Sequence, residues 1–87
     1  MTTISSKLPL EKSFHVRNGG ITFRSLLQLK EEIETISEED FLFHLKNGKN
    51  DFAEWILHVY NLPELASGIK KIKTKKGLVK KLQESGI

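Results

Sequence analysis

The sequence predicts a mainly α-helical protein, a compact bundle of about five short helices with an N-terminal β-hairpin. Three observations predict this fold class. Apolar and polar residues alternate on both sides of an Asn-Gly pair, the apolar period becomes helical from Ser25 onward, and capping signatures then recur along the chain. A length of 87 residues fits a single small domain. We expect a flexible lead at 1–8, the hairpin at 13–24, helices over 25–87 and a lysine-rich end at 70–81.

The predicted hairpin turns at Asn18-Gly19. This pair favours a type I′ turn, because both residues tolerate a positive φ. With that turn, Phe14 pairs with Phe23 and Val16 pairs with Ile21, so both apolar pairs lie on the same face. Since an isolated hairpin is only marginally stable in water, this face is expected to pack on the helices.

Five helix starts are predicted from residues that commonly cap helices. The expected caps are Ser25 with Gln28, Ser37 with Asp40, Asp51 with Glu54, Asn61 with Glu64, and Thr74. Pro63 suits the first turn of the fourth helix, and Asn47-Gly48 suits the end of the second. Gly77 is expected to weaken the last helix by about 1 kcal/mol relative to Ala.

The apolar positions of these elements predict one small core. Its expected members are Phe14, Val16, Ile21, Phe23, Leu26, Leu29, Ile33, Phe41, Leu45, Phe52, Trp55, Ile56, Val59, Leu65, Ile69 and Leu78. A chain of this length buries only about 60–65% of its unfolded surface. A deep pocket around a catalytic apparatus is therefore not expected, and we predict a protein that is not an enzyme and holds no metal or cofactor.

The composition also bears on cellular location. The chain contains no cysteine, so neither a disulfide framework nor a thiolate metal site is expected. No stretch approaches the roughly 20 apolar residues of a membrane span. The N-terminal sequence MTTISSKLPLEKS lacks the apolar core of a signal peptide. We therefore expect a cytoplasmic protein that does not bind a membrane.

Residues 41–56, FLFHLKNGKNDFAEWI, combine an F-x-x-H element with an N-D-F-x-x-W-I helix. An aromatic strand and a short helix precede them, and a Leu-Ala pair follows. These features are Phe14-His15-Val16, Ser25-Leu26-Leu27, Phe41 with His44, Asn50-Asp51-Phe52 with Trp55-Ile56, and Leu65-Ala66. The set resembles an uncharacterised family of small archaeal and bacterial domains of unknown function. The resemblance covers roughly Pro9 to Ile72 and implies a shared fold, but no activity.

The charge of the chain is strongly divided. Seven lysines and Glu84 give the last twenty-one residues a charge of +6, whereas seven basic and ten acidic side chains give the first sixty-six −3. The lysines are Lys70, Lys71, Lys73, Lys75, Lys76, Lys80 and Lys81. This charge suggests contact with the phosphates of RNA, DNA or a ribonucleoprotein. Because the whole chain has only two arginines, sequence-specific recognition of bases is not expected. The simpler interpretation is a solvated face.

An acidic surface provides an alternative function, a protein–protein interaction or self-assembly module. Six acids lie within ten residues: Glu31, Glu32, Glu34, Glu38, Glu39 and Asp40. They suit a basic protein partner or the lysine-rich end of a second copy. The simpler interpretation is again a solvated face, which also favours the start of the second helix.

A cluster of His44, Asp51 and His58 is a weaker candidate. Imidazole and carboxylate groups suit acid–base chemistry or metal binding, and His44 lies close enough in sequence to meet Asp51. However, the chain lacks the short His spacing of known zinc motifs. A structural role is therefore favoured, in which Asp51 caps a helix and His44 bonds to the loop between helices.

Two further sequence features are better explained by folding. Gly19-Gly20 and residues 46–50 match neither a P-loop nor a Rossmann motif, so turn formation explains both. The aromatic residues would suit stacking on bases, but the helical spacing of Trp55 and Tyr60 favours the core. Whether Phe14 and Phe23 of the hairpin lie in the core or at the surface stays open, because a two-stranded ribbon can expose one face.

Overall fold

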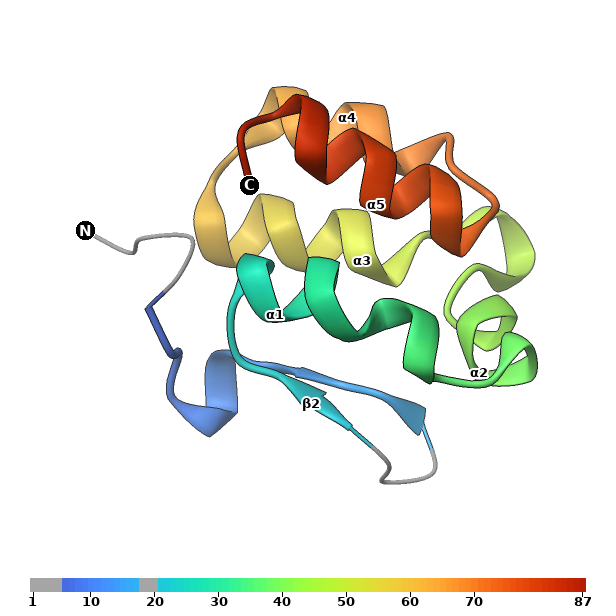
Figure 1. The fold of residues 1–87 in the computed structure, drawn as a ribbon, viewed down its shortest axis with the longest axis horizontal. Helices are drawn as coiled ribbons and strands as arrows, with labels where there is room; N and C mark the ends of the chain where they lie inside the picture. The colour runs from blue at the N-terminus through green and yellow to red at the C-terminus, as the bar shows by residue number, and fades with distance from the viewer. Residues whose placement is uncertain (1–5, 18–20) are drawn as a thin grey trace.

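A two-stranded antiparallel hairpin leads into a mainly helical chain, as the sequence predicts (Figure 1). The computed structural model describes residues 6–17 and 21–87. The predicted turn at Asn18-Gly19, the Gly19-Gly20 pair and the expected flexibility of residues 1–5 lie outside the described residues.

The hairpin has the predicted register. β1 (Phe14–His15) pairs with β2 (Thr22–Phe23), so that Phe14 lies opposite Phe23. The N–H of Val16 donates to the carbonyl oxygen of Ile21 at 3.0 Å, which extends the pairing toward the turn. Both phenylalanines are buried, which settles the question of their exposure in favour of the core.

The N-terminal lead is partly fixed, in contrast to the predicted flexibility of residues 1–8. The N–H of Leu8 donates to the carbonyl oxygen of Arg24 at 2.7 Å, and Arg24 Nε donates to the carbonyl oxygen of Leu8 at 2.9 Å. The Leu8 side chain is buried in the core. The sequence signal was weak because a single leucine beside Pro9 shows no periodicity.

The helices of the described chain are α1 (Leu26–Glu32), α2 (Glu38–Phe43), α3 (Asp51–Trp55), α4 (Pro63–Lys70) and α5 (Lys75–Glu84). Short 3-10 turns lie at Leu10–Lys12, Ile33–Thr35 and Lys46–Gly48, and a π-helical turn at Ile56–Tyr60 continues α3. The second helix ends earlier than predicted, at Phe43. Asn47 and Gly48 instead close the separate 3-10 turn that follows, with positive φ values of 57° and 75°.

Three of the predicted helix caps are confirmed. The side chains of Ser25, Ser37 and Thr74 each accept a hydrogen bond from the N–H three residues further on. At α1 the Gln28 side chain also reaches back, but its Oε1 accepts the N–H of Arg24, the residue before the cap, at 2.8 Å. Local hydrogen bonding of this kind depends only on near neighbours, which is why the sequence predicts it well.

Two predicted caps are wrong by one residue. Asn50, rather than Asp51, caps α3, and its Oδ1 accepts the N–H of Ala53 at 3.0 Å. Leu62, rather than Asn61, occupies the cap position of α4 and makes no side-chain cap bond. Asn61 instead ends the preceding π-helical turn in the left-handed conformation, with φ 54°. Pro63 is the first residue of α4, as predicted.

The core lies between the helices and one face of the hairpin. α4 packs against both α3 and α5, while α1 packs against α5 and β2 (Figure 1). Most predicted members are buried, but Ile21, Leu45 and Val59 are only partly buried at its edge. Buried apolar residues outside the predicted core are Leu8, Ile36, Ala53, Ala66 and Leu82.

Candidate nucleic-acid interface

The buried faces of α4 and α5 decide which lysines reach solvent. Ile69 on α4 and Leu78 and Leu82 on α5 are fully buried, so the opposite faces of these two helices point outward. Five of the seven candidate lysines are exposed, and together they are called the lysine surface: Lys70, Lys71, Lys73, Lys76 and Lys80. They come from the end of α4, the connection to α5, and α5 itself.

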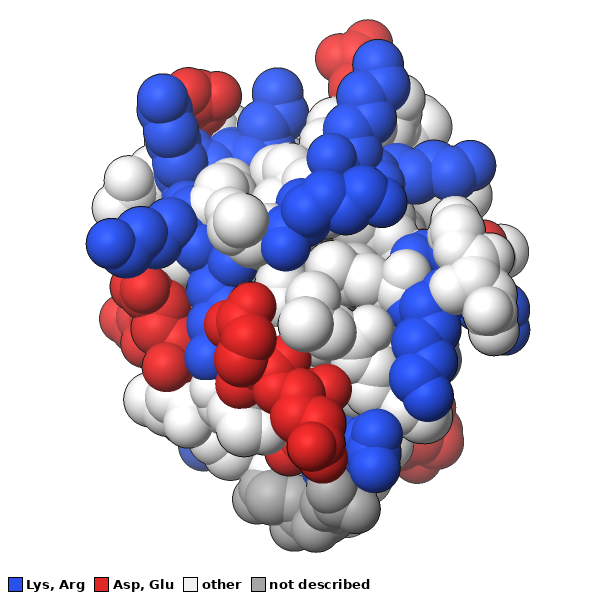
Figure 2. Space-filling model, turned by 90° about the vertical axis from the view of Figure 1, so that its right-hand side faces the viewer, with Lys and Arg blue, Asp and Glu red and all other residues white. Residues whose placement is uncertain are grey.

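The lysine surface lacks neutralising partners. Among residues 6–17 and 21–87, the ion pairs involve Arg17, His44, His58 and Lys75, and no carboxylate lies within ion-pair distance of the five lysines. Figure 2 shows basic side chains gathered over the upper part of one face, with acidic side chains below them. Charges that are not neutralised locally are available to attract a polyanion.

Lys75 does not belong to this surface, although the sequence placed it there. Its Nζ donates to the carbonyl oxygen of Ile36 and lies 4.0 Å from Glu38 Oε1. Only 14% of the Lys75 side chain is exposed. This lysine therefore joins the start of α5 to the turn between α1 and α2, a contact that sequence periodicity does not reveal.

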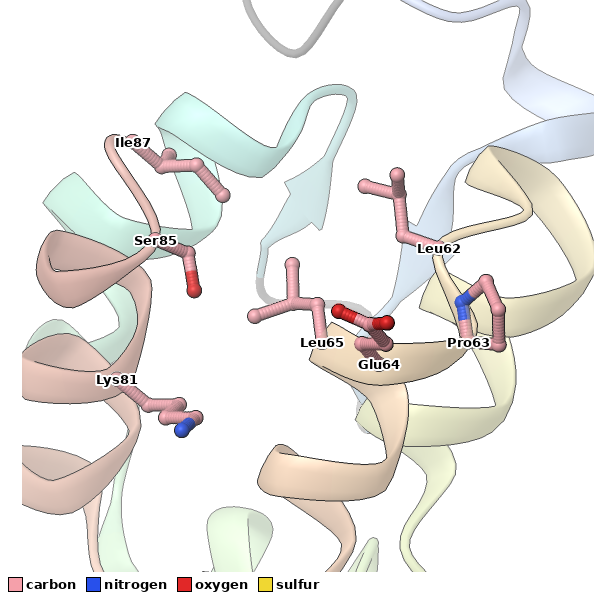
Figure 3. Close-up of a pocket in the computed structure, with 7 residues that line it drawn as sticks. All are labelled: Leu62, Pro63, Glu64, Leu65, Lys81, Ser85 and Ile87. Atoms are coloured by element: carbon pink, nitrogen blue, oxygen red, sulfur yellow. The ribbon is translucent and has the colours of Figure 1, made fainter.

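Lys81 is likewise turned away from the outer face of α5. Its stem lies over Gly68 of α4, where a Cβ atom would approach Lys81 Cε to 2.4 Å. Figure 3 shows its amine directed into a cavity of about 620 Å³ between the start of α4 and the end of α5. The residues lining this cavity are Leu62, Pro63, Glu64, Leu65, Lys81, Ser85 and Ile87.

Two lysines of residues 46–50, a segment that the sequence analysis explained by turn formation, extend the basic region. Asn50 Nδ2 donates to the carbonyl oxygen of Ile69 at 2.8 Å, which holds the turn before α3 beside the end of α4. Lys49 and Lys70 consequently line the same groove, of about 380 Å³. Lys46 precedes Lys49 by one turn and is also exposed. Their charge is visible in the sequence, but only packing brings them to the lysine surface.

The acidic segment, residues 31–40, lies beside the lysine-rich helices in the same molecule. Four of its six acids are exposed: Glu31, Glu34, Glu38 and Glu39. Asp40 is half-buried and pairs with Arg17 Nε at 3.7 Å. Glu38 is the acid nearest to Lys75. The opposite charges of the chain thus already meet within one copy.

His44 and Asp51 do come together, as their spacing suggested. His44 Nδ1 lies 3.0 Å from Asp51 Oδ2, and His44 Nε2 lies 3.2 Å from the main-chain nitrogen of Arg17. Because a main-chain N–H can only donate, Nε2 accepts and Nδ1 carries the proton toward Asp51. The buried imidazole therefore links the end of β1 to α2 and α3. His58 lies apart, paired with Glu54 on the surface.

Neither a metal-ligand group nor a membrane-spanning helix is found among the described residues. No three His, Asp or Glu side chains of residues 6–17 and 21–87 lie close enough together to hold a metal ion. None of the helices in this part of the chain has both the length and the apolar character needed to span a bilayer.

Most aromatic side chains serve the core. Trp55 Nε1 donates to the carbonyl oxygen of Lys12 at 2.8 Å, which fastens the lead to α3. The hydroxyl oxygen of Tyr60 accepts the N–H of Leu26, the first residue of α1, at 3.1 Å. Burial raises the pKa of Tyr60 above its ordinary value of 10.0, and this hydrogen bond partly opposes the rise. Phe43 is the exception, with 37% of the residue exposed.

The chain matches no protein-family model, no curated protein and no solved structure. The resemblance carried by residues 41–56 therefore stays a prediction. Function must be inferred from the geometry and charge of the described surface.

Proposed function

We propose that this protein is a small, non-enzymatic, cytoplasmic accessory domain that binds nucleic acid or a ribonucleoprotein through the lysine surface. The observation that carries the proposal is the group of five exposed lysines without a carboxylate at ion-pair distance in the described chain. Lys46 and Lys49 add to the same end of the molecule. Several unneutralised ammonium groups on one surface attract phosphates by releasing counterions, and this attraction does not depend on base sequence.

The chemistry of lysine favours contact with the backbone over recognition of a particular base. An ammonium group acts as a point charge, whereas the planar guanidinium of arginine suits bidentate contact with guanine. Of the two arginines, Arg24 already donates to Leu8. Arg17 lies beside Asp40. The expected ligand is therefore RNA or DNA with little sequence preference.

The test is binding of fluorescently labelled single strands and duplexes of RNA and DNA at low and physiological salt. Binding in the micromolar range or somewhat weaker is expected at physiological salt, with a linear fall of log affinity against log salt. The slope reports how many phosphates are neutralised. Absence of binding even at low salt would remove the proposal.

A matched pair of variants locates the contact. Lys71→Gln with Lys76→Gln removes two charges from the lysine surface, and Lys7→Gln with Lys12→Gln removes two exposed charges elsewhere. The first pair should lower the salt slope for a single strand by about 1.4, or about 0.7 for each lost contact. The second pair leaves it nearly unchanged. Equal effects of the two pairs would mean that total charge, not this surface, controls binding.

The alternative is a protein–protein interaction or self-assembly module that uses the acidic segment. Glu31, Glu34 and Glu39 are exposed and have no cation within ion-pair distance among the described residues. Leu42, which follows on α2, is also exposed and offers apolar contact area. A charge-mediated oligomer loses mass in solution as salt screens it. A mass that stays monomeric at low salt removes self-assembly and leaves only a different protein partner.

A further inference from the structure

Phe43 is a large aromatic residue that the fold leaves at the surface. It is the last residue of α2, and 37% of it is exposed, whereas the other described phenylalanines are buried. Exposing an aromatic ring loses the favourable free energy of burial. A single exposed ring is common on proteins, so its significance depends on what surrounds it.

Two cations lie over the Phe43 ring. Arg17 Cζ is 4.5 Å and Lys46 Nζ is 4.8 Å from the ring centroid. Asp40 holds the Arg17 side chain from the other side, with 3.7 Å between Nε and Oδ1. Proteins use both guanidinium groups and aromatic rings to stack nucleobases.

The Phe43 ring is held in position by the buried residue that follows it, His44. Phe43 contacts the His44 ring edge-on, with centroids 5.2 Å apart and an interplanar angle of 88°. His44 is itself held by Asp51 and by the main-chain N–H of Arg17. A surface ring that is already ordered loses little conformational entropy when a ligand stacks on it. The Phe43 ring is therefore held in one orientation at the surface.

The same region is continuous with the lysine surface. Lys46, which lies over Phe43, is in the turn that also carries Lys49. Lys49 and Lys70 line one groove, because Asn50 fastens this turn to the end of α4. A strand whose phosphates follow these lysines can therefore bring a base to Phe43.

We propose that Phe43, with Arg17 and Lys46, is a stacking site for an unpaired nucleobase, so that the protein prefers single strands over duplexes. The inference rests on the proposed function, since the lysine surface supplies most of the affinity. In a duplex the base faces are covered by neighbouring bases, so Phe43 has no open base face on which to stack. In a single strand a base can turn out and stack, and every base offers a face, so the preference is for strandedness and not for sequence.

The experiment compares two probes of equal charge: a labelled single-stranded oligonucleotide and an abasic oligonucleotide of the same length. The variants are Phe43→Ala and Phe43→Leu, with Leu42→Ala as the control that removes apolar surface from a neighbouring exposed residue. Phe43→Ala should weaken binding of the base-containing strand by between about 5-fold and 150-fold. Its affinity for the abasic strand and its salt slope should stay unchanged.

Phe43→Leu keeps apolar contact with His44 but lacks a planar ring, so it should lose most of the same affinity while the thermal unfolding midpoint stays close to that of the parent. Leu42→Ala should change neither probe. The stacking site is overturned if Phe43→Leu binds the base-containing strand as well as the parent does. It is also overturned, while the lysine surface stands, if the parent binds both probes equally. If neither probe binds, both the proposed function and this inference fail.

Discussion

The side-chain amide of Asn50 donates to the carbonyl oxygen of Ile69 at 2.8 Å, while its oxygen caps α3 by accepting the N–H of Ala53. One buried residue therefore begins a helix and fastens that helix to the end of α4. The connection places Lys49 on the same groove as Lys70. The shape of the basic region thus depends on this one amide, whose two ends have different partners.

Exchanging Asn50 for aspartate tests this double role. Asn50→Asp keeps an oxygen for the cap but removes the donor that Ile69 requires and buries a charge against a carbonyl. We expect the free energy of unfolding to fall by at least about 2 kcal/mol in urea titrations. The control is Asp51→Asn, the opposite exchange at the next residue, which is partly exposed and should cost less than about 1 kcal/mol. A larger loss of stability for Asp51→Asn than for Asn50→Asp would indicate that Asp51, and not Asn50, caps α3.

Replacing His44 separates its hydrogen bonds from its packing. His44→Phe retains a ring next to Phe14 and Phe52 but leaves the N–H of Arg17 without its acceptor. We expect a loss of about 1–3 kcal/mol in stability and faster hydrogen exchange of the Arg17 amide. His58→Phe, at an exposed position, should change stability by less than about 0.5 kcal/mol. Unchanged exchange at Arg17 would contradict the structural role of His44.

Tyr60 makes stability depend on pH in the alkaline range. Its pKa is raised in the folded protein above the ordinary value of 10.0, chiefly by burial. Above pH 10.0 the unfolded chain therefore releases this proton first, and the free energy of unfolding falls as pH rises toward the folded pKa.

The Tyr60→Phe variant isolates this contribution. At neutral pH it should be less stable than the parent by about 1 kcal/mol, because Leu26 loses a hydrogen-bond acceptor at the start of α1. Above pH 10.0 the difference should narrow, since only the parent loses stability through this hydroxyl, while lysine titration affects both proteins. Denaturant unfolding across this range measures the difference, and a constant gap would show that Tyr60 does not link folding to pH.

Replacing Gly68 or Gly77 by alanine should affect the free energy of unfolding differently. At Gly68 the nearest obstacle to a Cβ is the end of the flexible Lys81 side chain, which can move into solvent. Gly68→Ala should therefore raise the free energy of unfolding by about 0.5–1 kcal/mol through helix propensity. At Gly77 a Cβ would lie 2.9 Å from Thr74 Oγ1, the atom that caps α5, so Gly77→Ala should bring no gain. Urea titrations of both variants provide the comparison. Equal stabilisation of both would contradict the steric argument.

The contacts around Gly77 also bear on the expected cost of a glycine in the last helix. From sequence, glycine at this position is only a cost of about 1 kcal/mol relative to alanine. In the fold, a Cβ at this position would lie 2.9 Å from Thr74 Oγ1 and 3.2 Å from Ile72 Cγ2. These close contacts offset the gain in helix propensity, so the propensity value alone overstates the cost of Gly77.

Helical periodicity predicts the exposure of some candidate lysines correctly and misses the contacts of others. Lysines spaced against the buried stripe of α5 point outward, so the exposure of Lys76 and Lys80 follows from helical periodicity. Helical periodicity takes no account of contacts with other helices and turns, and such contacts hold two other lysines away from the outer face. Lys75 contacts the turn after α1, and Lys81 lies over α4.

The features that could be predicted from the sequence depend on near neighbours along the chain: the apolar faces of the helices, the caps at Ser25, Ser37 and Thr74, and the pairing of Phe14 with Phe23. These features follow from backbone geometry over a few residues, and their hydrogen bonds join residues that are close in the sequence. Hydrogen bonds between residues far apart in the sequence could be assigned only from the tertiary structure. Asn50 replaced Asp51 as the cap because only an amide supplies both the acceptor for α3 and the donor for Ile69.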